Sequence, residues 1–161
     1  MKKKLVALNE LIYRIELAAG VMILIFIVLL VFLQVFNRFI IRQPLTWSEE
    51  LSRYLFILLV FIGISVATKS KSHFGIDFIV RKLPRRLSRV MDVIVSVAVL
   101  SFLFIIFKES FLMIDLAMRQ KSPALGITIG YLYYIFPLFS GFCSLHVITN
   151  LVEGLSKEND L

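Results

Sequence analysis

The sequence predicts an all-α membrane protein of four transmembrane helices, forming a single domain over residues 1–161. Three observations point to this class. The 161 residues are 59% hydrophobic with a mean hydropathy of +0.89, well above an ordinary soluble domain. The charged residues gather between apolar runs that are long enough to cross a bilayer. The 18 lysines and arginines flank these runs, which favours membrane loops over a nucleic-acid-binding surface.

The first expected span covers residues 17–36, which carry no charge and would reach about 30 Å as a helix. The basic start of the chain resembles that of a signal peptide, but no small-residue cleavage site ends the long apolar run, so we expect an uncleaved helix. Gln34, Asn37 and Arg38 share one face at its end. That face either anchors the helix at the interface or contacts another helix or subunit.

The stretch from Pro44 to Gly63 starts as a polar turn and becomes an apolar run, with a second span expected at residues 51–67. Thr46 and Glu49 have the spacing of a capping box, and Glu49 and Arg53 that of an ion pair within the helix. We expect the boundary residues to fix the first two helices or to meet a partner chain. These residues are Arg38, Arg42, Trp47, Glu49, Glu50 and Arg53.

A polar loop and a short amphipathic basic segment should join the second and third helices. His73 and Asp77 are four residues apart and can pair on one turn, but no further ligands lie nearby, so we expect no metal there. The basic segment, which Pro84 breaks, is expected to lie along anionic lipid headgroups, with a protein contact as the alternative. Its cations are Arg81, Lys82, Arg85, Arg86 and Arg89.

The third and fourth spans are expected at residues 90–118 and 127–152. Lys108 and Glu109 fall either near the far interface or deeper, facing a partner protein. Pro137 should kink the fourth span. His146 reads as a buried or interfacial histidine.

The cations also predict an orientation, because cytoplasmic loops collect lysine and arginine. They concentrate at the amino terminus and in residues 69–89, which favours both termini in the cytoplasm. The boundary around Trp47 then lies on the outer side.

The sequence contains no motif for phosphate binding, paired-histidine metal binding or a nucleophile. No expected span carries a charge near its middle, where ion-coupled transporters usually keep polar groups, and Glu16 lies only at the rim of the first span. We therefore expect a helper subunit with no cofactor, rather than an enzyme. The alternatives are an autonomous four-helix transporter and a membrane haem protein.

The ordered motifs of the first half resemble the small membrane subunit of TRAP transporters, the DctQ or SiaQ type. The matching residues are Arg38, Pro44-Leu45, Trp47-x-Glu49-Glu50-x-x-Arg53, Gly63, His73 with Ile76-Asp77, and Leu83-Pro84. The second half matches in pattern only.

The resemblance implies a three-part system in the bacterial inner membrane. In such a system a periplasmic binding protein captures an organic acid, and a large elevator-type subunit carries it, driven by sodium. The small subunit braces the large one and helps to dock the binding protein, with no solute or sodium site of its own. Sialic acid, C4-dicarboxylates, sugar acids and keto acids all remain open as the solute.

The orientation can be tested with a reporter that is active only outside the cytoplasm. We expect it to be silent when fused after Arg86 and active when fused after Pro44, because the basic segment holds its side of the membrane in the cytoplasm. The reverse pattern would overturn the predicted topology.

Overall fold

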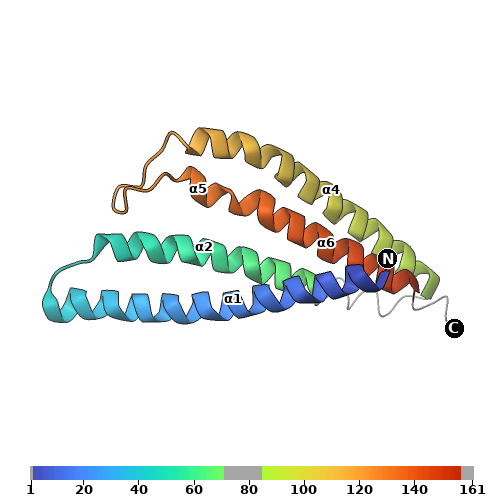
Figure 1. Ribbon diagram of the computed structural model, residues 1–161, viewed down its shortest axis with the longest axis horizontal. Coiled ribbons are helices and arrows are strands. Elements are labelled where there is room, and N and C mark those ends of the chain that lie inside the picture. Colours follow the sequence, from blue (N-terminus) through green and yellow to red (C-terminus); the bar gives the residue numbers. More distant parts are fainter. Residues whose placement is uncertain (1, 71–84, 157–161) are drawn as a thin grey trace.

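The computed structural model describes residues 2–70 and 85–156, and in these residues the chain is helical throughout apart from short connections (Figure 1). The expected roles of His73, Asp77, Arg81 and Lys82 lie outside the described residues. The elements are α1 (Lys2–Phe36), the π-helical turn η1 (Asn37–Ile41), α2 (Thr46–Lys69), α4 (Arg85–Ala117), α5 (Gly130–Tyr133) and α6 (Ile135–Ser156). Four stretches are long and apolar enough to cross a membrane, so the predicted fold class is confirmed.

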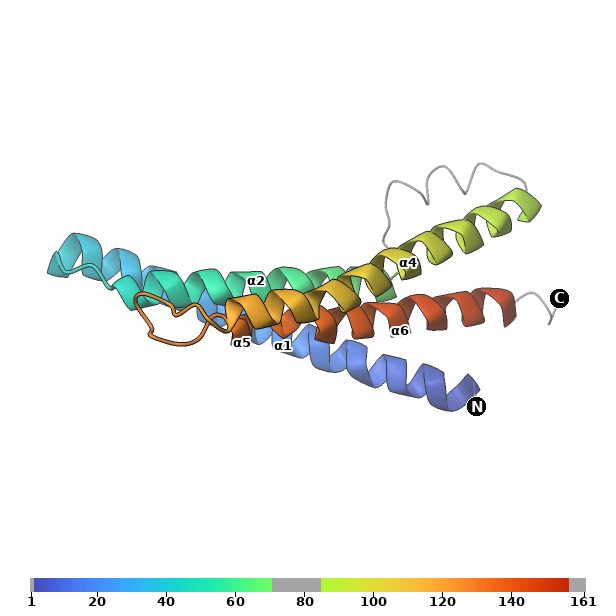
Figure 2. The same ribbon diagram turned by 90° about the horizontal axis from the view of Figure 1, so that it is seen from above.

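The long helices form two antiparallel pairs, α1 with α2 and α4 with α6 (Figure 1). The connections at residues 37–45 and 118–129 lie at one end of the bundle, which we call the loop end. The start of α1 and the end of α6 lie at the opposite end, the terminal end. Helix α2 packs against both α1 and α6 and so joins the two pairs. Towards its start, α4 diverges from α6 (Figure 2).

Helix α1 begins well before the expected span at residues 17–36. Glu16 therefore lies inside a continuous helix and not at its start. The charged residues before Glu16 belong to the same helix, so α1 continues from the apolar span into a polar stretch at its start.

The start of α2 differs from the expected capping box. The N-cap residue is Leu45, and no side chain caps the helix there. Instead the Ser48 hydroxyl donates to the Leu45 carbonyl at 2.8 Å. The turn before it is closed by Arg42, which adopts a left-handed conformation (φ 59°) and donates its backbone N–H to the Asn37 carbonyl.

Pro137 stands in the first turn of α6. A proline has no N–H to donate to the carbonyl four residues earlier, which here belongs to Tyr133, the last residue of α5. The helical path is accordingly interrupted at Tyr134, between α5 and α6. The predicted kink is thus a break at the start of the fourth helix.

A small apolar core lies where α1, α2 and α6 meet. Ile62, Ile135 and Phe139 are buried there, and the Phe61 ring meets the Phe136 ring edge-on at 4.9 Å between centroids. A side chain on Gly20 would come within 3.1 Å of Ile62, so the glycine allows α1 and α2 to approach closely. Outward apolar side chains on α1 and α4 are mostly exposed, as a lipid or protein environment requires.

Candidate functional site

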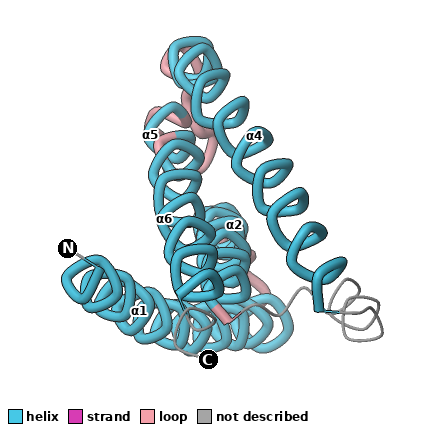
Figure 3. Tube along the Cα trace, turned by 90° about the vertical axis from the view of Figure 1, so that its right-hand side faces the viewer, coloured by secondary structure: helices cyan, strands magenta, loops and turns pink. Residues whose placement is uncertain are grey.

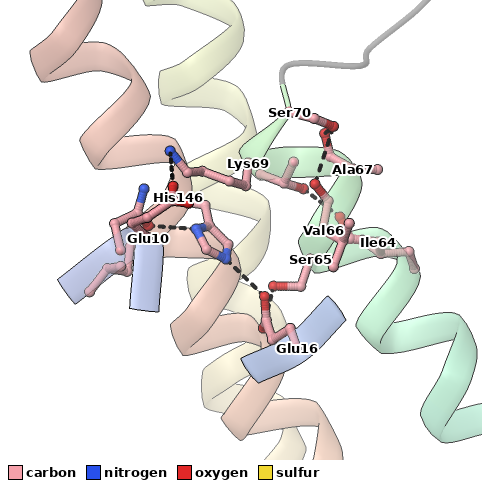
Figure 4. A network of polar contacts seen from close by, with 12 residues as sticks. Glu10, Glu16, Ile64, Ser65, Val66, Ala67, Lys69, Ser70 and His146 are labelled. Atoms are coloured by element: carbon pink, nitrogen blue, oxygen red, sulfur yellow. Dashed lines mark hydrogen bonds and ion pairs between the residues drawn. The ribbon is translucent and has the colours of Figure 1, made fainter. Parts of the chain in front are cut away.

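Four polar side chains from three helices meet inside the bundle, nearer the terminal end (Figure 4). Asn9 and Glu16 come from α1, Ser65 from α2 and His146 from α6. All are buried, with exposures between 0% and 4%. We call this set the inner polar cluster.

The contacts within the inner polar cluster form a chain. The Ser65 hydroxyl donates to Glu16 Oε1 at 2.7 Å. Glu16 Oε2 lies 3.0 Å from His146 Nε2, and His146 Nδ1 lies 2.5 Å from Asn9 Oδ1. Both ring nitrogens of His146 are therefore engaged, one by Asn9 and the other by Glu16, and both of these partners come from α1.

The local sequence explains how one helix supplies two members of this cluster. Asn9 and Glu16 are seven positions apart, close to two turns, so both point from α1 towards the same neighbour. Pairing also makes burial tolerable, because an isolated charge in a low-dielectric interior is far more costly than a paired one. The Asn9 amide nitrogen is buried without a hydrogen-bond partner among the described residues.

A second set of contacts closes the terminal end. The Asn150 side chain donates to the backbone carbonyls of Thr68 at 2.9 Å and Lys69 at 3.4 Å. These carbonyls end α2 and would otherwise lack helical partners. Lys69 also lies 3.9 Å from Glu10 of α1. The end of α2 is thus held by α6 and α1 together.

At the loop end, Glu50 connects α2 to the connection between α4 and α5. Its Oε2 accepts the backbone N–H groups of Ala124 at 2.9 Å and Leu125 at 3.1 Å. Its Oε1 accepts the Tyr54 hydroxyl at 2.6 Å. One carboxylate therefore orders a turn far from it in the sequence.

The other predicted boundary residues are placed on the outside of the loop end. Glu49 and Arg53 form the expected pair at 3.5 Å, but both are more than half exposed. The Arg38 guanidinium lies 5.9 Å from the centre of the Phe39 ring. Among the described ion pairs and hydrogen bonds, none joins Arg38 or Arg42 to a glutamate.

The structure also places Trp47 and the arginines of the basic segment that lie within the described residues. Trp47 is 41% exposed in the first turn of α2. Arg85, Arg86 and Arg89 belong to the first two turns of α4.

Sequence reasoning missed the inner polar cluster. It treated Glu16 as a residue at the rim of the first span and gave His146 no partner on the first helix. The available signal was the spacing of Asn9 and Glu16, which places both on one face of that helix. Their partners lie on other helices, so that signal could not have named them.

Among the described residues, four helices are long and apolar enough to span a membrane, which defines the class as a multi-pass membrane protein. The chain belongs to the family described as the DctQ component of tripartite ATP-independent periplasmic transporters, which matches residues 27–157. This family is a transporter component and not an enzyme.

Individual relatives agree with this assignment. A TRAP transporter small permease protein of Haemophilus influenzae is 27% identical over 141 residues, covering 88% of this chain and 86% of that protein. The sialic acid TRAP transporter small permease protein SiaQ of Vibrio cholerae is 30% identical over 125 residues, covering 76% and 72%. The sialic acid TRAP transporter permease protein SiaT of Haemophilus influenzae is 38% identical over 76 residues, which are 46% of this chain but 12% of that protein.

The role of Glu50 can be tested on the connection that it binds. Glu50→Ala removes the acceptor of two backbone N–H groups, so a cysteine introduced at Ala124 should react several-fold faster with a membrane-impermeant maleimide. The native Cys143 is buried and gives a low background. The matched control is Glu49→Ala, which should leave the rate unchanged. Equal rates in the two variants would contradict the role of Glu50.

The inner polar cluster should contribute strongly to stability. Glu16→Ala leaves His146 and Ser65 buried without their partner, and we expect the free energy of unfolding to fall by about 3–5 kcal/mol. Glu49→Ala, which removes an exposed pair with Arg53 within α2, should cost less than about 1 kcal/mol. Circular dichroism during denaturation in mixed micelles measures both. A similar loss in the two variants would contradict a special role for the cluster.

Proposed function

We propose that this chain is the small, non-catalytic membrane subunit of a sodium-driven TRAP transporter for organic acids, which braces the large elevator-type subunit in the bacterial inner membrane. The observation that carries the proposal is how the inner polar cluster joins the helices. Glu16 contacts Ser65 and His146, and His146 also contacts Asn9. Polar groups that are used to hold three helices together suit a static scaffold better than a pathway for a polar solute.

The large permease subunit is the first proposed neighbour. Part of this chain resembles 12% of the much longer permease SiaT, so related sequences occur alongside larger transport domains. The family is described as a component of tripartite transporters, which supports a large subunit as a partner of this chain. The large subunit would supply the moving parts and the solute and sodium sites.

The periplasmic binding protein is the second proposed partner. We assign its docking to the loop end, where exposed charged and aromatic groups gather around an ordered turn. Docking there requires the loop end to face the periplasm and the terminal end to face the cytoplasm. The residues in question are Arg38, Arg42, Trp47, Glu49, Glu50 and Arg53.

In this orientation the basic segment lies at the cytoplasmic face. We assign its cations to anionic headgroups, which attract polybasic stretches close to a membrane surface. The residues are Arg81, Lys82, Arg85, Arg86 and Arg89.

The proposed solute is an organic acid of the sialic acid or dicarboxylate class. Two relatives are named for sialic acid transport and a third for C4-dicarboxylate transport, which supports a solute that carries a carboxylate. The choice among such acids would be made by the binding protein and the large subunit.

Reconstitution tests the proposal. Proteoliposomes with the large subunit, this chain and the binding protein should take up the organic acid when a sodium gradient is imposed. Vesicles lacking this chain should lose most of that uptake, and vesicles with this chain alone should show none. Uptake by this chain alone would show it to be an autonomous transporter, the principal alternative.

A further inference from the structure

A polar stripe runs along the outer face of α4. Ser101, Lys108 and Asp115 recur every seven residues, so they lie near one line along the helix. All three are exposed, and no helix within residues 2–70 and 85–156 covers them. We call these residues the α4 stripe. Glu109 lies beside it.

The opposite face of α4 is the one that packs within the bundle. Ser110, Ile114 and Ala117 are buried there. The Ser140 hydroxyl of α6 donates to the Leu103 carbonyl at 2.7 Å. At about 100° per residue, Lys108 is turned about 160° away from Ser110. The α4 stripe therefore points away from the rest of the chain.

The centre of the stripe lies within the apolar span of α4, Val90–Ala117. With a rise of about 1.5 Å per residue, Lys108 is about 10 Å from Asp115 and about 24 Å from Asp92 along the helix. Side chains on a helix lean towards its start, and for α4 this direction leads away from the loop end. Lys108 therefore leans away from the nearer polar surface, which disfavours snorkelling to it.

The local ion pair does not satisfy these groups. Lys108 Nζ lies 3.7 Å from Glu109 Oε1, beyond hydrogen-bonding distance, and the two side chains are 73% and 55% exposed. An ammonium has three donors, and a carboxylate accepts several hydrogen bonds. In hydrocarbon, charged side chains at a helix centre are unfavourable. Such residues normally face protein or water.

We propose that the α4 stripe and Glu109 form a docking surface for a transmembrane helix of the large permease subunit, which presents polar or oppositely charged side chains at the same depth. This inference rests on the proposed function, and it adds which face of α4 contacts the large subunit. A second copy of this chain fits less well, because a two-fold axis along the membrane normal would bring Lys108 opposite Lys108 and Asp115 opposite Asp115. Like charges would then meet in a medium of low dielectric constant.

Site-specific photo-crosslinking in membranes that hold the complete transporter tests the location. A photo-reactive amino acid replaces Ile105 or Leu112, exposed residues that flank Lys108, or Met22 on the exposed face of α1 as the control. We expect crosslinks to the large subunit from both α4 positions. Crosslinks to the large subunit from Met22 alone, or from α4 only to a second copy of this chain, would overturn the inference and leave the proposed function standing. If the two subunits neither crosslink at any position nor co-purify, the proposed function itself fails.

A substitution distinguishes a protein contact from a lipid contact. The double variant Lys108→Met and Glu109→Leu should reduce co-purification of the large subunit several-fold, although apolar side chains suit a lipid-facing position better. The matched control, Arg14→Met, removes another exposed ion pair, keeps Glu10 for its contact with Lys69, and should leave co-purification unchanged. Gel filtration of each variant checks that it is folded. Full co-purification by the folded double variant would show that the stripe faces lipid.

Discussion

The contact between Glu16 and His146 is the interaction on which the bundle depends. It joins the first long helix to the last, and the Ser65 hydroxyl adds α2 through the other carboxylate oxygen. In a bilayer the hydrophobic effect does little to bring helices together, because lipid is as apolar as the side chains. Interhelical hydrogen bonds and close packing must do so. Gly20 against Ile62 supplies the close packing one turn from Glu16.

Two further contacts extend this restraint to both ends of the bundle. Asn150 holds the last carbonyls of α2 at the terminal end, and Glu50 holds the backbone at Ala124 and Leu125 at the loop end. Helix α2 is thus tied to its neighbours at three levels. A helix fixed in this way suits a subunit that provides a stationary support, while its outer surfaces remain available to lipid and to partner chains.

The fold class could be predicted from the sequence, because a bilayer allows few structures and each span must be long and apolar. The inner polar cluster could not. Glu16 and His146 are 130 residues apart, and the pairing follows only once the helices are placed side by side. The contacts of Glu50 could not be predicted either. Its carboxylate accepts a backbone N–H group 74 residues away, whereas the sequence suggested partners at the same membrane boundary. The capping box failed because α2 begins at Thr46, so Leu45 and not Thr46 is the N-cap residue. The sequence left Lys108 between two interpretations, and the structure places it exposed on the face of α4 opposite α6.

A double-mutant cycle on Glu16 and His146 tests the central claim most directly. The free energy of unfolding is measured for the native chain, Glu16→Leu, His146→Leu and the double variant. If the two side chains form a buried pair that locks α1 to α6, each single change strands a buried polar group, and the double variant should recover at least about 1.5 kcal/mol relative to the sum of the single losses. Strictly additive losses would contradict the claim, because they would mean that the two residues stabilise the bundle independently.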